Sequence, residues 1–303
     1  MTFSVTILGS GAAVPTYDRN TTAQLVEVRN SFLLLDCGEG TQIQLRKTGA
    51  RIQKIAHIFI SHLHGDHYFG LIGFLNTLHL LGRKHELHLY GILPLKQLID
   101  MQLELSRTSL SYPLFFHPID TEESSIILDT DRFSVTTIPL KHRVPTCGFL
   151  IREKPEKRKM RKEFLKKVKV PIESFEGIKK GEDFTDEKGN HYPNHLMTMD
   201  PPPVKSYAYC SDTAYHEPII PIINNCDLLY HEATFMEDKV KDAHDKFHST
   251  AGEAATIALK ADVKKLVIGH LSARYKDANG LLHEAKQNFP ETILGEDGMK
   301  IEV

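Results

Sequence analysis

The sequence has no tryptophan, only 4 cysteines and no excess of charge of either sign. Its 37 Lys and Arg residues against 39 Asp and Glu residues give a formal net charge of −2. Domains that bind nucleic acid typically have a pI above about 9, so the composition by itself points away from DNA and RNA. The cysteines stand singly, without a C-x-x-C pair, which excludes a disulfide framework and favours a reducing, cytoplasmic location.

Long apolar runs are absent as well. The richest run, residues 69–81, is interrupted by Asn76, Thr77 and His79 and is shorter than the ~18 residues of a membrane span, so it indicates a buried helix. Residues 1–9 have no basic stretch ahead of their apolar residues, and we expect no signal peptide. We therefore predict no membrane partner. The 41% apolar content of the 303 residues is enough to fill a sizeable core.

Two successive sets of strand-like segments alternate with helical patterns. The strand-like runs lie at 4–8, 23–28, 32–36, 55–61 and 87–90, and then at 133–138, 147–151, 206–210, 228–231 and 266–269. Helical periodicity follows Glu39 and Asp66 and returns at 250–259 and 279–287. This order predicts an α/β fold with two sheets packed face to face and helices outside, a four-layer sandwich. Periodicity leaves the strand order open.

One segment departs from this pattern. Residues 152–180 hold 12 Lys and Arg residues against 5 Asp and Glu residues, a local charge of +7. The rest of the chain holds 25 Lys and Arg residues against 34 Asp and Glu residues. The apolar residues of 152–180 form a narrow stripe on an otherwise basic helix: Met160, Phe164, Leu165 and Val168. We predict a single domain, 1–303, that carries residues 152–181 as an inserted arm, with 182–203 as a loop back to the core. Such a patch could dock phosphates without reading bases.

The strongest motif is His62-Leu63-His64-Gly65-Asp66-His67, directly after a strand-like run. Alternate residues of an extended segment share a side, so His62 and His64 can hold one ion. Gly65 allows the chain to turn, which can aim Asp66 and His67 at a second ion. Histidines with carboxylates suit zinc best, with manganese as the substitute. The motif therefore predicts a dinuclear metal site.

This motif resembles the signature of the metallo-β-lactamase superfamily of dinuclear metallohydrolases, whose fold is an αβ/βα sandwich. The other superfamily motifs match in chain order at Asp36, His142, Asp212 and His270. The resemblance implies two Zn²⁺ per subunit, with Mn²⁺ as a possible substitute. One ion would be held by His62, His64, His142 and Asp212. The other would be held by Asp66, His67, His270 and the shared Asp212. Asp36 would support the site from outside the ligands.

Four further features resemble the ribonuclease Z family, endonucleases that trim the 3′ trailer of precursor transfer RNA. They are His231-Glu232-Ala233-Thr234, His248-Ser249-Thr250, the loop from Pro15 to Asn20, and the basic insertion. The resemblance implies that His248 protonates the leaving oxygen and that Asp66 orients or deprotonates the attacking water. Glu232 would orient a neighbouring histidine, which the sequence does not identify. Ser249 or Thr250 would also suit a helix N-cap.

The same resemblance implies where RNA is bound. The insertion corresponds to the family's flexible arm, which grips the transfer RNA elbow, although lysine and arginine mostly replace the usual Gly-Pro-rich pattern. Tyr17 stands where the family's loop has lysine, and an aromatic ring there could stack on a base. The predicted RNA contacts are Arg19, Asn20, Arg274, Arg158, Lys159, Arg161, Lys162, Lys166, Lys167, Lys179 and Lys180.

The resulting prediction is a zinc-dependent endoribonuclease that cuts precursor transfer RNA after the discriminator nucleotide and leaves a 3′-hydroxyl. The implied partners are precursor transfer RNA and a second copy of the chain, with no DNA. Two alternatives stay open. One is a small-molecule phosphodiesterase or thioesterase of the same fold, which would not need the insertion. The other is a non-catalytic RNA-binding subunit, which would be expected to lack metal ligands, and the sequence lacks none of those expected.

Overall fold

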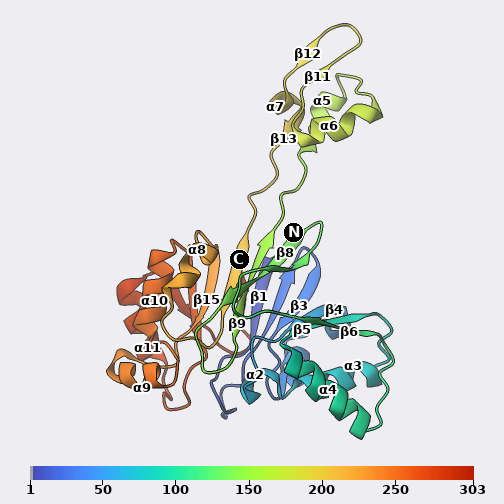
Figure 1. Ribbon diagram of the computed structural model, residues 1–303. Coiled ribbons are helices and arrows are strands. Elements are labelled where there is room, and N and C mark those ends of the chain that lie inside the picture. Colours follow the sequence, from blue (N-terminus) through green and yellow to red (C-terminus); the bar gives the residue numbers. More distant parts are fainter. Residues whose placement is uncertain (1–2) are drawn as a thin grey trace. The chain divides into compact units, whose positions relative to one another are not determined.

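The computed structural model describes residues 3–303, so Met1 and Thr2 fall outside the described residues. The chain divides into two compact units. The core unit comprises the residues up to Arg152 together with Lys205–Val303, and the inserted unit comprises Glu153–Val204. The inserted unit thus lies, in sequence, between two segments of the core unit (Figure 1).

The first sheet of the core unit contains seven strands in the described part of the chain. Their order is β18 (Lys300–Glu302), β1 (Phe3–Gly9), β2 (Ala23–Val28), β3 (Ser31–Leu35), β4 (Ile55–Phe59), β5 (Leu87–Gly91) and β6 (Leu114–Pro118). From β3 to β6 the neighbouring strands run parallel. The carboxyl ends of these parallel strands therefore lie along one edge, where the metal motif follows β4.

The second sheet also contains seven strands within residues 3–303. Their order is β17 (Thr292–Leu294), β16 (Leu266–Gly269), β15 (Leu228–Glu232), β14 (Ser206–Cys210), β9 (Cys147–Glu153), β8 (Phe133–Pro139) and β7 (Ile126–Asp129). The predicted two-sheet α/β architecture is confirmed. Because β18 from the chain's end joins the first sheet, the two sheets do not correspond strictly to the two halves of the sequence.

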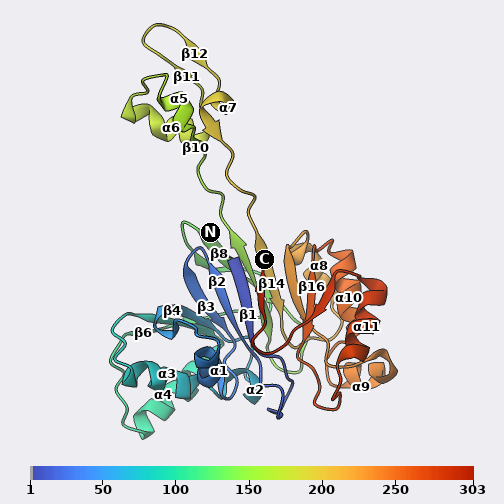
Figure 2. The same ribbon diagram turned by 180° about the vertical axis from the view of Figure 1, so that it is seen from behind.

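Helices cover the outer faces of both sheets and complete the four layers (Figure 2). Beside the first sheet lie α1 (Thr41–Lys47), α2 (Gly65–Tyr68), α3 (Leu71–Leu80), α4 (Leu93–Leu105) and the 3₁₀ turn η1 (Ile52–Lys54). Beside the second lie α8 (Ile220–Ile223), α9 (Val240–Asp245), α10 (Ala251–Lys260), α11 (Asn279–Asn288), η3 (Glu217–Ile219) and η4 (Glu237–Lys239). Within residues 3–303, no helix combines the length and the apolar character that crossing a membrane requires.

The inner faces of the two sheets share a buried core that is rich in aromatic rings. Phe59 and Tyr90 stack with centroids 4.4 Å apart, and Tyr209 and Tyr230 stack with centroids 5.3 Å apart. Each such ring removes about 150–250 Å² from water, so this layer contributes strongly to stability. It gives the strand ends that carry the metal motifs a fixed support.

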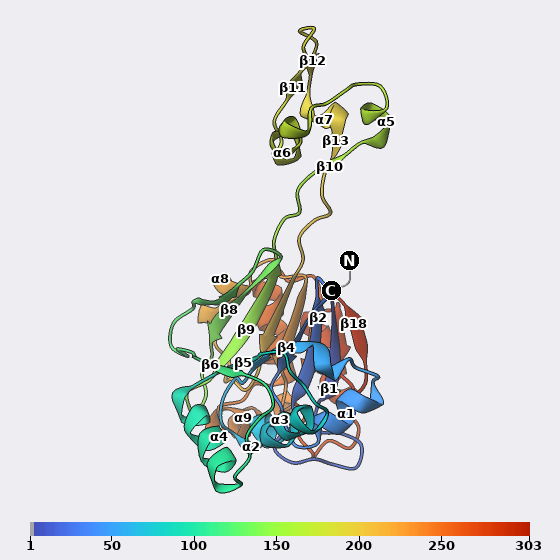
Figure 3. The same ribbon diagram turned by 90° about the vertical axis from the view of Figure 1, so that its right-hand side faces the viewer.

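The inserted unit is longer and folded differently from the predicted arm. Its elements are β10 (Lys159–Met160), α5 (Lys162–Leu165), η2 (Ile172–Ser174), α6 (Phe175–Lys180), β11 (Phe184–Thr185), β12 (His191–Tyr192), α7 (Asn194–Met197) and β13 (Thr198–Met199) (Figure 3). The prediction of a single basic helix is wrong, because α5 ends at Leu165 and Pro171 lacks the N–H that a continuing helix would need. The stripe residues Met160, Phe164 and Val168 pack instead in a small core.

The prediction of a loop over residues 182–203 is also wrong. Phe184 and Met197 from this segment are buried beside Ile178, and they complete the small core that the basic half of the unit cannot close by itself. Residues 182–203 are acidic. Glu153–Val204 contains 12 Lys and Arg residues but 10 Asp and Glu residues, so the net charge of the whole unit is only +2.

Candidate metal centre

The metal motif occupies the turn between β4 and α2. His64 has extended backbone angles and immediately precedes α2, while Gly65 is the first residue of that helix. A Cβ atom at Gly65 would lie 2.2 Å from the Phe69 ring, so a side chain at this position would displace the ring. Gly65 thus leaves room for the Phe69 ring where the extended segment passes into α2.

Four predicted ligands form a first cluster, in which one atom from each residue lies within 4.8 Å of the others: His62, His64, His142 and Asp212. His62 Nε2 and His142 Nε2 lie 3.6 and 3.8 Å from Asp212 Oδ2. His142 Nε2 also lies 3.2 Å from His64 Nδ1. The nitrogen atoms therefore converge on one point beside a single carboxylate oxygen.

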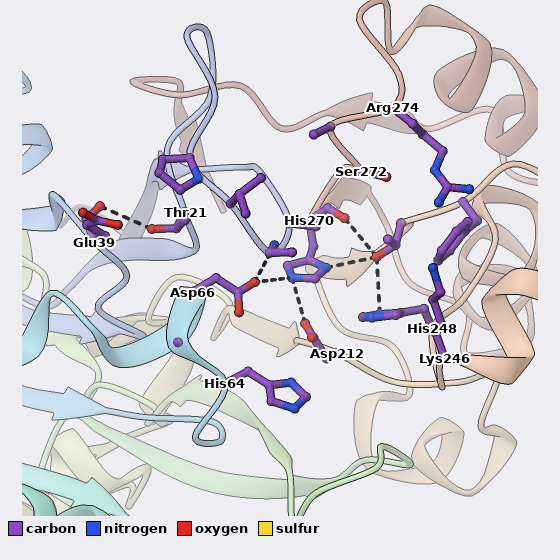
Figure 4. Close-up of a pocket in the computed structure, with 18 of the residues that line it drawn as sticks. Thr21, Glu39, His64, Asp66, Asp212, Lys246, His248, His270, Ser272 and Arg274 are labelled. Carbon is purple, nitrogen blue, oxygen red and sulfur yellow. Dashed lines mark hydrogen bonds and ion pairs between the residues drawn. The ribbon is translucent and has the colours of Figure 1, made fainter.

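A second cluster joins Asp66, His67 and His270. His270 Nε2 lies 3.2 Å from Asp66 Oδ2 and 3.1 Å from Asp212 Oδ1 (Figure 4). His67 Nε2 lies 3.2 Å from the same Asp212 oxygen. Asp212 therefore turns Oδ2 toward the first cluster and Oδ1 toward the second. A carboxylate placed in this way can bind two adjacent cations, one through each oxygen.

The donor set fits metal ions better than it fits hydrogen bonds among its own members. His62 Nε2 is buried and has no hydrogen-bond partner among the described residues. His67 Nε2 and His270 Nε2 lie only 3.3 Å apart. Two unprotonated imidazole nitrogens cannot bond to each other, whereas both can donate electron pairs to a cation. The geometry thus supports a metal site made of histidine and carboxylate ligands.

Asp36 supports this site from behind, as predicted from the resemblance. It is fully buried, and its carboxylate accepts hydrogen bonds from the backbone N–H of Ser61 (2.7 Å), the Ser61 hydroxyl (2.9 Å) and the Tyr209 hydroxyl (2.6 Å). Its Oδ2 lies 2.8 Å from His67 Nδ1. A proton held on Nδ1 leaves Nε2 of His67 free to bind metal. Sequence analysis missed the Ser61 and Tyr209 contacts, which join distant segments.

Two further acceptors orient His142 and His270, the predicted ligands that lie far from the motif in the sequence. His142 Nδ1 lies 2.9 Å from the carbonyl oxygen of Phe247, and His270 Nδ1 lies 3.0 Å from the Thr234 hydroxyl. In both cases Nε2 is left to face the cluster. The Thr234 hydroxyl also donates to Glu232 Oε2 at 2.7 Å. The H-E-A-T motif signalled this threonine, but its contact with His270 could not be predicted.

The histidine that Glu232 orients is His248. Glu232 is fully buried, and its Oε1 lies 2.7 Å from His248 Nδ1. Burial acts to lower the pKa of His248, but the Glu232 carboxylate outweighs it and raises this pKa to about 9. Thr250, not Ser249, is the N-cap of α10, in a capping box with Glu253. His231 is buried, with its Nδ1 2.7 Å from the Glu232 carbonyl oxygen, and belongs to neither metal cluster.

The two metal clusters and His248 lie at a pocket of about 700 Å³ (Figure 4). Asp66, Asp212, His248 and His270 all face it. Burial acts to raise the pKa of Asp66, but His67 and His270 lower it below its usual range, so Asp66 remains a carboxylate. The pocket wall also includes two cations that sequence analysis did not single out, Arg143 and Lys246. No local pattern marks these two residues, because their place depends on how distant segments pack.

The predicted RNA contacts near the pocket differ in their surroundings. Asn20 donates from its backbone N–H and its side chain to Asp297 Oδ2, at 2.7 and 2.8 Å, so its amide group holds the chain together. Arg19 Nη1 donates to the Tyr275 carbonyl oxygen at 3.1 Å. Arg274 faces the pocket. Tyr17 is fully exposed.

In the inserted unit, the predicted RNA contacts fall into three groups. Arg158 and Arg161 make hydrogen bonds within the unit. Arg158 Nε donates to the Thr198 hydroxyl at 2.7 Å, and Arg161 Nε donates to the Thr198 carbonyl oxygen at 2.9 Å. Lys159 and Lys180 lie within ion-pair distance of Glu156 and Glu176. The remaining predicted contacts have no ion pair within residues 3–303: Lys162, Lys166, Lys167 and Lys179.

Comparisons with known proteins agree with this geometry. A protein named ribonuclease Z from Parabacteroides distasonis is 46% identical over 301 residues, which cover 99% of each chain. Another ribonuclease Z, from Bacteroides thetaiotaomicron, is 44% identical and matches 99% of this chain and 95% of its own. The family model described as anti-Pycsar protein Apyc1 matches residues 3–159.

Solved structures share the fold. The crystal structure of the short form of human tRNase Z superposes with a TM-score of 0.72 at 28% identity and covers 98% of both chains. The metallo-β-lactamase fold protein YhfI from Bacillus subtilis superposes with a TM-score of 0.68 at 21% identity over the full length of both chains. The second likeness concerns the fold alone.

Proposed function

Since the chain belongs to the ribonuclease Z family and, through residues 3–159, to the family of Apyc1, we propose that it is a metal-dependent endoribonuclease that removes the 3′ trailer of precursor transfer RNA. Hydrolysis of one phosphodiester after the discriminator nucleotide leaves a 3′-hydroxyl on the transfer RNA and a 5′-phosphate on the trailer. The observation that carries this proposal is that two metal clusters joined by Asp212 and the His248–Glu232 pair come together at one pocket, which Asp66, Asp212, His248 and His270 line.

The proposed cofactor is a pair of Zn²⁺ ions, with Mn²⁺ as a substitute. His62, His64, His142 and Asp212 would hold one ion, and Asp66, His67, His270 and Asp212 the other. Such a pair lowers the pKa of a bound water from 15.7 toward about 7 and neutralises charge that builds on the phosphoryl oxygens.

The chain's own residues direct the proton transfers. Asp66 Oδ2 accepts the Ala13 backbone N–H at 2.7 Å, which fixes the carboxylate that would orient the attacking water. With Nδ1 of His248 held by Glu232, its Nε2 is the atom that would deliver a proton to the departing 3′ oxygen. Glu232 stabilises the protonated imidazole and is therefore a positioning residue.

In the inserted unit, we propose RNA contact at the four predicted lysines that have no ion pair within residues 3–303. Lys162, Lys166 and Lys167 are exposed on and just after α5. The Nζ atom of Lys179 lies 5.9 Å from the Phe175 ring, in a groove of about 440 Å³ that also includes Lys157. Arg158 and Arg161 would contribute by keeping the unit folded. The contact would be electrostatic and would not read bases.

Two further proposals concern assembly and location. Exposed apolar side chains on α4, among them Met101 (57% exposed) and Leu105 (78% exposed), support a homodimer, because such patches commonly mark interfaces. All four cysteines are free and buried, which supports a reducing, cytoplasmic location.

The alternative within the fold is a small-molecule phosphodiesterase or thioesterase. The relatives named ribonuclease Z match nearly the whole chain, the inserted unit included, and the small-molecule alternative would not need that unit. This match favours the RNA substrate.

The deciding experiment incubates the zinc-loaded protein with a precursor transfer RNA that bears a 3′ trailer and maps the cut. We expect one cut after the discriminator nucleotide and a 3′-hydroxyl end. Cleavage of small diesters with no cleavage of the precursor would establish the alternative, and fewer than two ions per chain with no cleavage would favour a binding subunit.

A further inference from the structure

One side of the pocket carries two cations that share an aromatic support. The guanidinium carbon of Arg274 lies 4.7 Å from the centroid of the Phe235 ring, and Lys246 Nζ lies 5.7 Å from it. The ring is 2% exposed, so it is a fixed part of the wall. A cation held against such a ring is partly ordered before a ligand arrives, which lowers the entropy cost of binding.

The two cations are not equivalent. Arg274 Nη1 lies 3.5 Å from Asp242 Oδ2, so its charge is partly neutralised within the protein. Lys246 is exposed at the pocket and has no carboxylate within ion-pair distance among residues 3–303. It is an uncompensated positive charge, and the ligand that it suits is an anion.

The cation pair borders the proton donor. The ring centroids of Phe235 and His248 lie 6.1 Å apart, so one ring contacts Lys246, Arg274 and His248 together. Figure 4 shows these three charged residues on one side of the pocket, while Thr21 and Glu39 lie on the other. Two of the three cations that line the pocket, Lys246 and Arg274, therefore lie on the side of His248.

The chemistry of the proposed reaction predicts which part of the RNA lies on this side of the pocket. Water attacks the phosphorus atom, the bond to the 3′ oxygen breaks, and His248 protonates that oxygen. The oxygen stays with the discriminator nucleotide, whereas the phosphoryl group leaves with the trailer. The discriminator nucleotide therefore lies against His248, and its own 5′ phosphate is the next negative charge along the strand.

We infer that Lys246, supported by Arg274 and Phe235, binds the 5′ phosphate of the discriminator nucleotide and so holds the mature end of the transfer RNA, not the trailer. The inference rests on the proposed function, because the direction of the strand follows from the leaving oxygen. It makes Lys246 a substrate-binding residue that sets the register of the cut.

The test compares Lys246→Met, which keeps an unbranched side chain one atom shorter and removes its charge, with Lys241→Met. Lys241 is exposed on α9 and does not line the pocket, so it is a control with the same change in net charge. Each zinc-loaded variant is given three precursors. The first is unmodified, the second has an uncharged methylphosphonate as the 5′ linkage of the discriminator nucleotide, and the third has it at the first linkage within the trailer.

On the unmodified precursor we expect Lys246→Met to lower kcat/KM about tenfold, the size of one charge-assisted contact, and Lys241→Met to leave it unchanged. On the second precursor the wild-type protein should slow by a similar factor, and Lys246→Met should add little further loss. On the third, the tenfold difference between wild type and variant should persist. Lys246→Arg should recover most of the activity on the unmodified precursor.

Each other result overturns the inference. An unchanged rate for Lys246→Met excludes a role in binding. A difference that disappears on the third precursor and persists on the second places Lys246 on the trailer, and equal differences on all three place it on neither phosphate. The wild-type cut of the unmodified precursor reports on the proposed function separately, because its absence would refute that function whatever Lys246 does.

Discussion

Glu232 Oε1 lies 2.7 Å from His248 Nδ1, and this contact joins two motifs that are 16 residues apart in the chain. The carboxylate is buried and also accepts the Thr213 backbone N–H at 3.1 Å, so its position is fixed independently of the histidine. The pair therefore presents His248 to the pocket in one orientation. Its pKa, raised to about 9 by Glu232 against the effect of burial, keeps the imidazole protonated at neutral pH.

Replacing Glu232 with Gln should change how activity depends on pH. In the proposed mechanism the protonated His248 is the active form, so activity is expected to decline as pH rises through its pKa. Without the carboxylate, burial dominates and the pKa falls, so the alkaline decline of kcat should move to lower pH and the loss should be larger at pH 8 than at pH 6. A pH–rate profile of the zinc-loaded variant checks this. Profiles of the same shape in variant and wild type would contradict the role of Glu232.

Replacing His248 with Ala should separate chemistry from binding. We expect kcat to fall by about 10²- to 10⁴-fold, the range for loss of a general acid, while precursor affinity and metal content stay near wild type. The metal content matters because His248, Asp212 and His270 also lie close enough to form a cluster. Metal analysis together with single-turnover cleavage decides the outcome. Loss of an ion would make His248 a ligand and remove the general-acid role.

Replacing Thr234 with Val, a side chain of nearly the same shape, should weaken metal binding. The hydroxyl lies 3.0 Å from His270 Nδ1, and its removal leaves this nitrogen without the partner that directs Nε2 to the cluster. Loss of such a support typically lowers metal affinity 10–100-fold. Competition with a chelator measures the affinity, and Thr234→Ser should restore it. An affinity equal to wild type in both variants would show that other contacts suffice.

Deletion of the inserted unit should impair cleavage of transfer RNA selectively. Arg152 on β9 pairs with Ser206 on β14, so a short loop can rejoin the two strands. We expect a large drop in kcat/KM on precursor transfer RNA, a weaker dependence on salt, and retained hydrolysis of a minimal phosphodiester such as bis(p-nitrophenyl) phosphate.

A matched control keeps the unit and changes only its free cations. Replacing Lys162, Lys166 and Lys167 together with Gln should reproduce part of the loss on transfer RNA without altering the melting temperature of the core unit. Equal activity of the deletion variant on both substrates would favour the small-molecule alternative.

Acid should destabilise the protein partly through His57. Burial, followed by the charges of His88 and His117, lowers the pKa of His57 to about 4. The unfolded chain therefore takes up this proton first, and stability is lost as pH falls from about 6.5 through 4, by up to about 3 kcal/mol from this group. Urea titrations of His57→Phe should show a weaker pH dependence than wild type. His283→Gln, an exposed position, is the control that should not change it.

The local sequence determined the metal centre to a large extent. Residues 62–67 bring four polar groups to the end of β4, and alternation along an extended strand with a glycine turn predicts their division between two clusters. The two sheets also follow from local patterns, since alternation and turn residues act within a few positions. His142, Asp212 and His270 were assigned through the family resemblance, and the structure brings them to the same site.

Only the tertiary structure decided the remainder, because contacts between distant segments leave no local periodicity. It pairs Glu232 with His248 and brings Lys246 to the pocket beside Phe235. In the inserted unit, residues 182–203 supply apolar side chains that complete the small core and five of the unit's ten Asp and Glu residues. The sequence by itself thus defined the chemistry of the metal ligands, whereas packing decided which cations remain without an ion pair.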